Sequence, residues 1–423
     1  MMKVFRADLL TMKDRELFFI EDAAMLVNED GKISEIIEFN KLSDEFLNEV
    51  SDLRPCLIMP GFIDTHVHYP QTNMRGSWSG SLLEWLMDVA YKEEGKFRNE
   101  TYSKSIACSF LDNLLSNGTT TALSYGSSFK RADEILLETA YEKGYPLITG
   151  MVFMDREVDG NLKVDAQKAY DDHKTLSRKW RKKGRIDVAL TPRFAISCTE
   201  EMLNVCKAIA TDDNDIIIQT HLSESKEEIK KVRELFPESR YYLDVYLKYD
   251  LVKEKSIFAH CIHLSDYEWE ILREKGSSIS HCPSSNLFLG SGLFNYRKAR
   301  DLKIKTGIGT DIGAGTSFSL LHNAELAYYI QKIQGYNMMP VDLFASITSG
   351  AAEVLGLQDQ IGTLEKGKYA DFVVIAPEND SNFLERYKTE ENINEKLFLI
   401  IMSGQERLIS RVYISGNLAY KKG

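Results

Sequence analysis

The sequence has little of what marks secreted and membrane proteins. Its 423 residues include only six cysteines, without disulfide or metal-ligand spacing. In a chain of this length, such cysteines are typical of reduced and mostly buried thiols, which favours a cytoplasmic protein. No run of about 18 apolar residues is present, so we expect no membrane-spanning helix. Lys3, Arg6 and Asp8 interrupt the first residues, and we therefore expect no signal peptide.

Basic stretches are also missing. The formal net charge is −11, and no stripe of lysine and arginine is interleaved with aromatic residues. Nucleic acid is therefore not an expected partner. The acidic balance favours solubility and says little else about function.

What the sequence does have is a regular alternation of strands and helices. Eight apolar, β-branched runs are each followed by a longer stretch of helical character. The predicted strands are Phe62–Val67, Thr119–Tyr125, Leu147–Met154, Asp187–Phe194, Ile216–His221, Ser256–His260, Ser277–His281 and Thr306–Asp311. One helix start is marked by Ser265 and Glu268 as a capping box, and Gly276 follows its end. The alternation indicates parallel βαβ units, and eight of them predict an α/β fold, a (β/α)8 TIM-like barrel over residues 61–365.

The two chain ends have a different pattern. Residues 1–60 contain short alternating strands, and residues 366–423 contain Phe372–Ile375 and a hairpin of Leu408–Ser415 with Leu418–Tyr420. Neither end is long enough to bury a good core alone. We therefore predict that both termini form one small β-sandwich that holds the barrel. The alternative is two independent flaps.

Metal-binding residue types fall at the ends of four predicted strands. His66 and His68 are two apart, so both side chains point the same way from the end of the first strand. His221 ends the fifth strand, His260 the sixth and Asp311 the eighth. Three imidazoles with a carboxylate suit Zn²⁺. Satisfied core histidines are the alternative interpretation, but they do not account for four matching positions.

The motifs around these residues are recognisable. Pro60-Gly61-Phe62-Ile63-Asp64-Thr65-His66-Val67-His68 resembles the signature of the amidohydrolase superfamily. Its context is similar to that of the guanine deaminase family, in order from about residue 55 to the end of the chain. The matching segments are His68-Tyr69-Pro70-Gln71, Leu82-Leu83-Glu84-Trp85-Leu86, Thr191-Pro192-Arg193-Phe194, His221-Leu222-Ser223-Glu224, Ala259-His260-Cys261 and Gly309-Thr310-Asp311-Ile312-Gly313.

The resemblance implies a role for each matching residue. One zinc per chain would be held by His66, His68, His221 and Asp311. Glu224 would shuttle protons, and His260 would contact the hydrolytic water rather than bind the metal firmly; together with Asp311 they are the expected catalytic residues. The purine pocket would be lined by Gln71, Arg193, Phe194 and Trp85.

The implied reaction is hydrolytic deamination of guanine to xanthine and ammonia. Zinc lowers the pKa of bound water to roughly 7, and a carboxylate such as Glu224 must take and return the proton. The resemblance also implies a homodimer acting in purine catabolism. Superfamily members with two metals usually bridge them with a lysine of the fourth strand. Asp187–Phe194 contains no lysine, which favours one metal. Zinc deaminases that use Cys-x-x-Cys are excluded, because that motif is absent.

Two competing functions stay open at this point. An aminohydrolase acting on another aminopurine, an aminopyrimidine or a triazine would share the metal site and differ only in the pocket. A scaffold protein that has lost catalysis would normally have lost metal ligands, and this chain keeps them.

Four other histidines are not expected to bind metal. We expect His281 to pack or to bond within a loop and His263 to make a local loop contact. His173 and His322 fall in helical stretches, where a solvated or partly buried histidine is typical. Trp85 could be helix core at ordinary spacing or part of a lid over the pocket.

Overall fold

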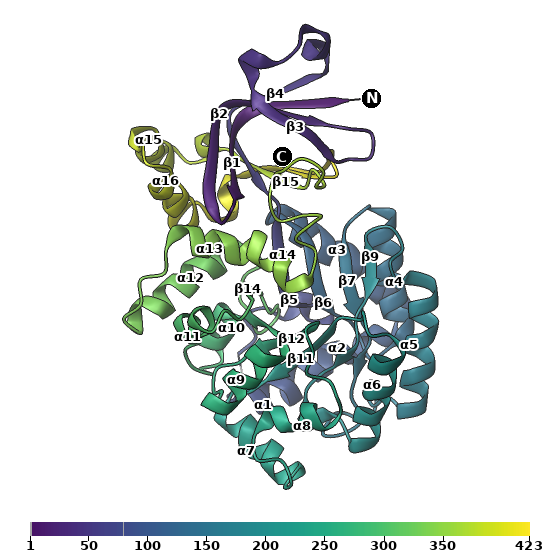
Figure 1. The fold of residues 1–423 in the computed structure, drawn as a ribbon. Helices are drawn as coiled ribbons and strands as arrows, with labels where there is room; N and C mark the ends of the chain where they lie inside the picture. The colour runs from purple at the N-terminus through teal and green to yellow at the C-terminus, as the bar shows by residue number, and fades with distance from the viewer. Residues whose placement is uncertain (1, 79) are drawn as a thin grey trace.

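The two ends of the chain meet in one sheet, in the upper part of Figure 1. The structure is a computed structural model that describes residues 2–78 and 80–423. The seven strands run in the order β17-β16-β15-β4-β1-β2-β3. Their bounds are β1 (Lys3–Lys13), β2 (Glu16–Val27), β3 (Ile33–Glu38), β4 (Val50–Pro60), β15 (Phe372–Ile375), β16 (Ile409–Ile414) and β17 (Asn417–Lys421).

The joint between the chain ends is the antiparallel pair of β15 and β4, in register from Phe372 opposite Pro60 to Ile375 opposite Leu57. The alternative of two independent flaps is therefore wrong. The hydrogen bonds join the terminal strands into one seven-stranded sheet, where the sequence analysis expected a small β-sandwich. Its strands β15 and β16 are separated by two helices that the sequence analysis did not expect, α15 (Ser381–Thr389) and α16 (Ile393–Leu399).

The rest of the chain alternates parallel strands with helices, as expected. The strands are β5 (Phe62–His68), β6 (Thr119–Tyr125), β7 (Leu147–Gly150), β8 (Val152–Phe153), β9 (Ile186–Val188), β10 (Thr191–Pro192), β11 (Ile218–Leu222), β12 (Ser256–His260), β13 (Ser278–His281) and β14 (Thr306–Ile308). The main covering helices are α3 (Glu100–Ser116), α4 (Lys130–Glu142), α5 (Ala166–Trp180), α6 (Glu200–Asp212), α7 (Lys226–Leu235), α8 (Tyr242–Lys248), α9 (Asp266–Lys275), α12 (Leu320–Ile333), α13 (Pro340–Ile347) and α14 (Ser349–Leu355). The mixed α/β class is thus confirmed.

Hydrogen bonds connect the two parallel sheets, β5-β6-β7-β9 and β11-β12-β13-β14, at both ends. On one side, the Gln219 amide donates to the Leu190 carbonyl at 3.0 Å. On the other, the Asp311 amide donates to the His66 carbonyl at 2.8 Å, and the His68 amide donates to Ile312. The strands therefore follow one another in the order expected of the predicted barrel.

Local signals account for the start and end of the α9 helix. Ser265 Oγ accepts the Glu268 amide at 3.3 Å, and the Glu268 carboxylate accepts the Ser265 amide at 2.8 Å. Gly276 follows the helix with φ of 67°, a left-handed conformation that favours glycine. The capping box and the glycine stop are both confirmed.

Candidate metal centre and active site

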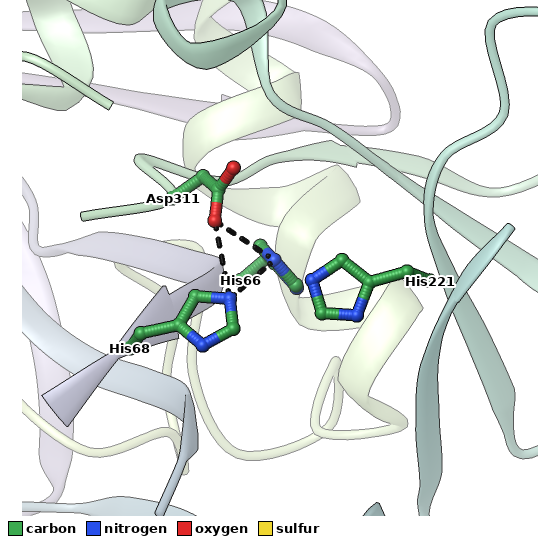
Figure 2. A group of neighbouring side chains, drawn as sticks. All are labelled: His66, His68, His221 and Asp311. Carbon is green, nitrogen blue, oxygen red and sulfur yellow. Dashed lines mark hydrogen bonds and ion pairs between the residues drawn. The ribbon is translucent and has the colours of Figure 1, made fainter. Parts of the chain in front are cut away.

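Four predicted ligands converge where strands β5 and β11 and the loop after β14 come together (Figure 2). His66 Nε2 lies 3.1 Å from Asp311 Oδ1, and His68 Nε2 lies 3.2 Å from both that oxygen and His66 Nε2. One ligand atom from each of His66, His68, His221 and Asp311 lies within 4.8 Å of the others. This arrangement can hold one metal ion.

The protonation states of these residues also suit a metal. Burial lowers the pKa of His68 to about 4 and that of His221 well below 6.5, so both imidazoles are neutral near pH 7. Burial acts to raise the pKa of Asp311, but the neighbouring His66 outweighs it and the pKa is well below 3.8. His221 Nδ1 donates to the Arg193 carbonyl at 2.6 Å, which leaves Nε2 as the lone-pair donor. Neutral imidazoles and an ionised carboxylate are the forms that bind a cation.

A second group, His66, His260, Cys282 and Asp311, overlaps the first. Metals bind cysteine as the thiolate. Burial raises the pKa of Cys282 well above 9, and its Sγ contacts the Ser280 carbonyl at 3.7 Å. The first group therefore fits a metal better.

His260 and Glu224 face each other beside the predicted ligands. Asn286 Nδ2 donates to His260 Nδ1 at 2.9 Å, so the proton of the neutral ring lies on Nε2. That nitrogen is buried without a hydrogen-bond partner among the described residues, 3.4 Å from Glu224 Oε2 and 3.9 Å from Asp311 Oδ2. An Nε2–H can donate to a ligand or a water but cannot bind a cation in this tautomer.

Glu224 is a buried carboxylate with a strongly shifted pKa. Burial raises its pKa well above 4.5, and the charges of Asp311 and Glu228 add to the shift. Ser291 Oγ donates to Glu224 Oε1 at 3.0 Å, which leaves Oε2 toward His260. Such a group can carry a proton near neutral pH.

The sequence analysis missed Glu228, which lies behind Glu224. Its Oε2 accepts the Glu224 amide at 2.7 Å and the Ser225 amide at 3.3 Å, and Tyr242 donates to its Oε1 at 2.9 Å. Burial raises the pKa of Glu228 to about 7. The only local signal was the capping box that Ser225 and Glu228 form at the start of α7.

A cavity opens onto this cluster, with about 390 Å³ of space between its lining atoms, part of it open to solvent. The four predicted substrate residues all line it, together with Glu224 and His260. The lining residues are His68, Gln71, Leu82, Trp85, Leu86, Arg193, Phe194, His221, Glu224, Glu228, His260, Leu289, Asp311 and Ala314.

Trp85 belongs both to the buried core and to the lining of the cavity, the two places that the sequence left open for it. It is buried at the end of α1 (Leu82–Trp85), and its indole N–H donates to the Ser77 carbonyl at 3.1 Å. Its ring also lines the cavity, with Leu82 and Leu86 of the same segment. The segment therefore packs against the core and covers part of the cavity.

The histidines set aside lie away from the four-residue cluster. His281 is buried against the Phe294 ring at 4.7 Å, with neither ring nitrogen bonded within the described residues. His263 contacts the Ser291 carbonyl at 2.8 Å. His322 is partly exposed on α12, whereas His173 is 2% exposed and thus more deeply buried than expected.

The cluster at the carboxyl ends of parallel strands is a possible metal-binding site, typical of one class of hydrolases. Residues 57–419 match the model of the amidohydrolase family, and the chain belongs to this family.

Similar proteins narrow this class. The guanine deaminase of Escherichia coli strain K12 is 40% identical over 408 residues, which cover 96% of this chain and 93% of that protein. The structure of E. coli guanine deaminase aligns with a TM-score of 0.96 at 38% identity and covers 100% of both chains. The guanine deaminase of C. acetobutylicum with bound guanine gives 0.92 at 28% identity, covering 99% of this chain and 100% of that one. Within its family, the chain thus belongs with the guanine deaminases.

Proposed function

We propose that this chain catalyses the zinc-dependent hydrolysis of guanine to xanthine and ammonia on an eight-stranded (β/α) barrel. One observation carries the proposal: a possible metal site, the proton carrier Glu224 and the polar pocket residues Gln71 and Arg193 all face one cavity. The guanine-bound relative supports the choice of substrate.

The chain's own residues fit a bound metal ion. His66, His68, His221 and Asp311 would hold one zinc ion, because the neutral imidazoles of His68 and His221 and the ionised carboxylate of Asp311 converge with His66 on one point. Zinc bound there would lower the pKa of a water ligand to roughly 7 and so supply the nucleophile.

Glu224 and His260 would manage protons around the reacting carbon, C2 of guanine. Glu224 Oε2 takes one proton of the water and gives it to N3; it then takes the second proton, from the hydroxyl now on C2, and gives it to the departing amine as the C2–N bond breaks. His260 Nε2–H, with Asn286 fixing its tautomer, donates a hydrogen bond to the same water. The products balance as xanthine and ammonia, and no covalent enzyme intermediate is needed.

Arg193 would select guanine among related bases. Its fork can donate to the O6 and N7 acceptors of guanine, whereas adenine replaces O6 with an amine donor. Arginine cannot accept a hydrogen bond, so adenine would leave donors facing donors. Phe194, whose ring lies 6.4 Å from the His221 ring, supplies an apolar wall.

Ammonia release from a panel of amino-purines, amino-pyrimidines and amino-triazines tests the proposal. We expect guanine to be the preferred substrate, with little or no release from adenine or cytosine. Arg193→Gln should keep the metal and still donate a hydrogen bond to Glu94, the buried partner of Arg193, but reduce guanine turnover strongly. Arg178→Gln, on an exposed arginine of α5, is the matched control. Preference for adenine or a triazine would instead support the competing aminohydrolase function, and no activity on any base would support the scaffold.

We further propose a cytoplasmic homodimer that acts in purine catabolism. All six cysteines are free, which supports a reducing compartment. Among the described helices, none is both long and apolar enough to cross a membrane. Sedimentation of the purified protein tests the dimer.

A further inference from the structure

A carboxylate just outside the cavity holds two of the side chains that line it. Glu94 ends α2 (Tyr91–Glu94) and is 5% exposed. Its oxygens accept hydrogen bonds from Arg193 Nη1 at 2.9 and 2.7 Å, and Oε1 also accepts from Gln71 Nε2 at 2.8 Å. One buried acid therefore connects the two polar groups that we expect to recognise the substrate.

The contact with Glu94 decides which donors Arg193 presents. The guanidinium is 3% exposed and uses Nη1 for both carboxylate oxygens. Burial acts to lower the pKa of Arg193, but the charge of Glu94 outweighs it, so the pKa is raised and the cation is kept. Nε and Nη2 have no hydrogen-bond partner among the described residues, and Arg193 lines the cavity. These donors are thus free for a ligand.

The same carboxylate decides which way the Gln71 amide faces. Gln71 Oε1 accepts the Gly313 amide at 3.0 Å, while Nε2 donates to Glu94. Rotating the amide by half a turn would place its NH₂ against the Gly313 N–H and its oxygen against the carboxylate. Both contacts would then be repulsive, because neither pair contains a donor and an acceptor. Glu94 and Gly313 together hold one of the two orientations.

We infer that Glu94 is a specificity-determining positioning residue, which sets the hydrogen-bonding groups that Arg193 and Gln71 show to the bound base. Glu94 itself does not line the cavity and touches no reacting group. The identity of the base rests on the proposed function, whereas the positioning rests on these contacts alone.

Glu94→Gln replaces one carboxylate oxygen with an NH₂ that faces a cation or a second amide donor. Arg193 loses its two-oxygen contact, and the Gln71 amide loses its preferred orientation. Binding of guanine should weaken, while the residues around its reacting carbon C2 keep their positions. We therefore expect KM for guanine to rise at least about tenfold, with a smaller change in kcat and unchanged metal content.

Discrimination between substrates is the measurement that a merely structural role of Glu94 would leave unchanged. 2-Aminopurine keeps the amine at C2 but lacks the O6 acceptor. The ratio of kcat/KM for guanine over 2-aminopurine should fall about tenfold or more in Glu94→Gln. The reason is that the variant loses the hydrogen-bond recognition of O6, which only guanine carries. Glu94→Asp keeps the charge but shortens the side chain, and we expect an intermediate ratio and a folded protein if Glu94→Gln is too unstable to isolate.

Glu93→Gln is the matched control. Glu93 is the preceding residue of the same helix, and it bonds Lys96 and Tyr102 rather than the pocket residues. Its KM and substrate ratio should equal those of the wild type. If both Glu94 variants keep wild-type KM and ratio, the inference is wrong.

Crystal structures of the Glu94 and Glu93 variants test the positioning without reference to any substrate. Arg193 and Gln71 should move in Glu94→Gln and stay fixed in Glu93→Gln; unmoved side chains in both would overturn the inference. A wild-type protein that releases no ammonia from guanine would overturn the proposed function instead, and the structures would still decide the role of Glu94.

Discussion

At the scale of single residues, the environment of Glu224 separates it from an ordinary surface glutamate. Burial and the nearby Asp311 and Glu228 carboxylates raise its pKa well above 4.5. A general acid–base works best when its pKa lies near the working pH. The hydrogen bond from Ser291 opposes the shift and leaves the other oxygen toward His260. The side chain is thus prepared to exchange a proton rather than to bind a metal.

Glu224→Gln should separate proton transfer from binding. The amide cannot carry the proton, so kcat for guanine should fall by roughly 10²–10⁴-fold. Metal content and guanine affinity should stay near the wild-type values, measured by elemental analysis and calorimetry. Glu227→Gln, on an exposed glutamate of α7, should have normal kcat. Near-normal turnover of Glu224→Gln would remove this residue from the mechanism.

The residues missed by the sequence analysis share one physical cause. His66 and His68 can be recognised from the sequence alone, because their spacing places both on one face of a strand. Glu94 follows another glutamate in a charged segment, and its partner Arg193 lies 99 positions away. No local pattern distinguishes a glutamate that will be buried against a distant arginine from one in solvent.

At the scale of elements, the strands β6, β12 and β15 have the predicted bounds, whereas the runs Leu147–Met154 and Asp187–Phe194 each break into two short strands. A Cβ at Gly150 would lie 1.9 Å from the Ala189 carbonyl oxygen, so two backbones approach where only glycine fits. Such a close approach depends on a neighbouring strand and is invisible in a single run.

The eighth strand also ends earlier than predicted, at Ile308 rather than Asp311. Asp311 has φ of 50°, a left-handed conformation that interrupts a strand and costs a non-glycine residue some energy. The loop that follows turns the carboxylate toward His66, at 3.1 Å. The Asp311 carboxylate was therefore predicted at the right place in the chain but on the wrong kind of element.

The α5 helix carries a histidine whose burial makes stability depend on pH. Burial, followed by the charges of Arg181 and Lys174, lowers the pKa of His173 from 6.5 to about 4. Between these values the unfolded chain binds a proton that the folded chain does not. The contribution of His173 is therefore fully present above pH 6.5 and is lost as the pH falls toward 4.

His173→Gln should flatten the pH dependence of stability in that window. The slope of unfolding free energy against pH, from urea titrations between pH 4 and 6.5, should decrease, with an integrated difference of up to about 3 kcal/mol. His322→Gln changes a partly exposed histidine of α12 and serves as the control. Equal slopes in His173→Gln and the wild type would contradict the assignment.

At the scale of the whole molecule, one ion pair connects the terminal sheet to the parallel strands. Arg185, just before β9, donates to both oxygens of Asp371, just before β15, at 2.8 and 2.5 Å. The Asp371 side chain is 3% exposed, and its Oδ1 also accepts the Ser415 amide at 2.9 Å. The pair joins segments that are 186 positions apart.

Asp371→Asn should destabilise the protein without changing the chemistry of the site. Removing one charge leaves Arg185 unpaired and mostly buried, which costs roughly 3 kcal/mol of unfolding free energy. Calorimetry should show a lower Tm, while kcat for guanine at 25 °C should stay normal. The double variant Arg185→Met/Asp371→Leu should recover much of the loss, because no unpaired charge is left. A normal Tm in Asp371→Asn would show that the contact between the terminal sheet and the parallel strands does not depend on this ion pair.

The metal should likewise stabilise the whole chain, since its proposed ligands come from strands β5 and β11 and from the loop after β14. His66 Nε2, His68 Nε2 and Asp311 Oδ1 lie within 3.2 Å of one another. A ligand that binds only the folded state at 100 times its Kd adds about 2.7 kcal/mol of stability. We therefore expect elemental analysis to find close to one zinc per chain, and a chelator to lower both Tm and activity until zinc is restored.

His68→Ala should lose zinc and show a Tm that no longer responds to chelator. His263→Gln, which changes a histidine outside the cluster, should retain the metal. Two metals per fully active chain would contradict the single site that the missing lysine in Asp187–Phe194 favours.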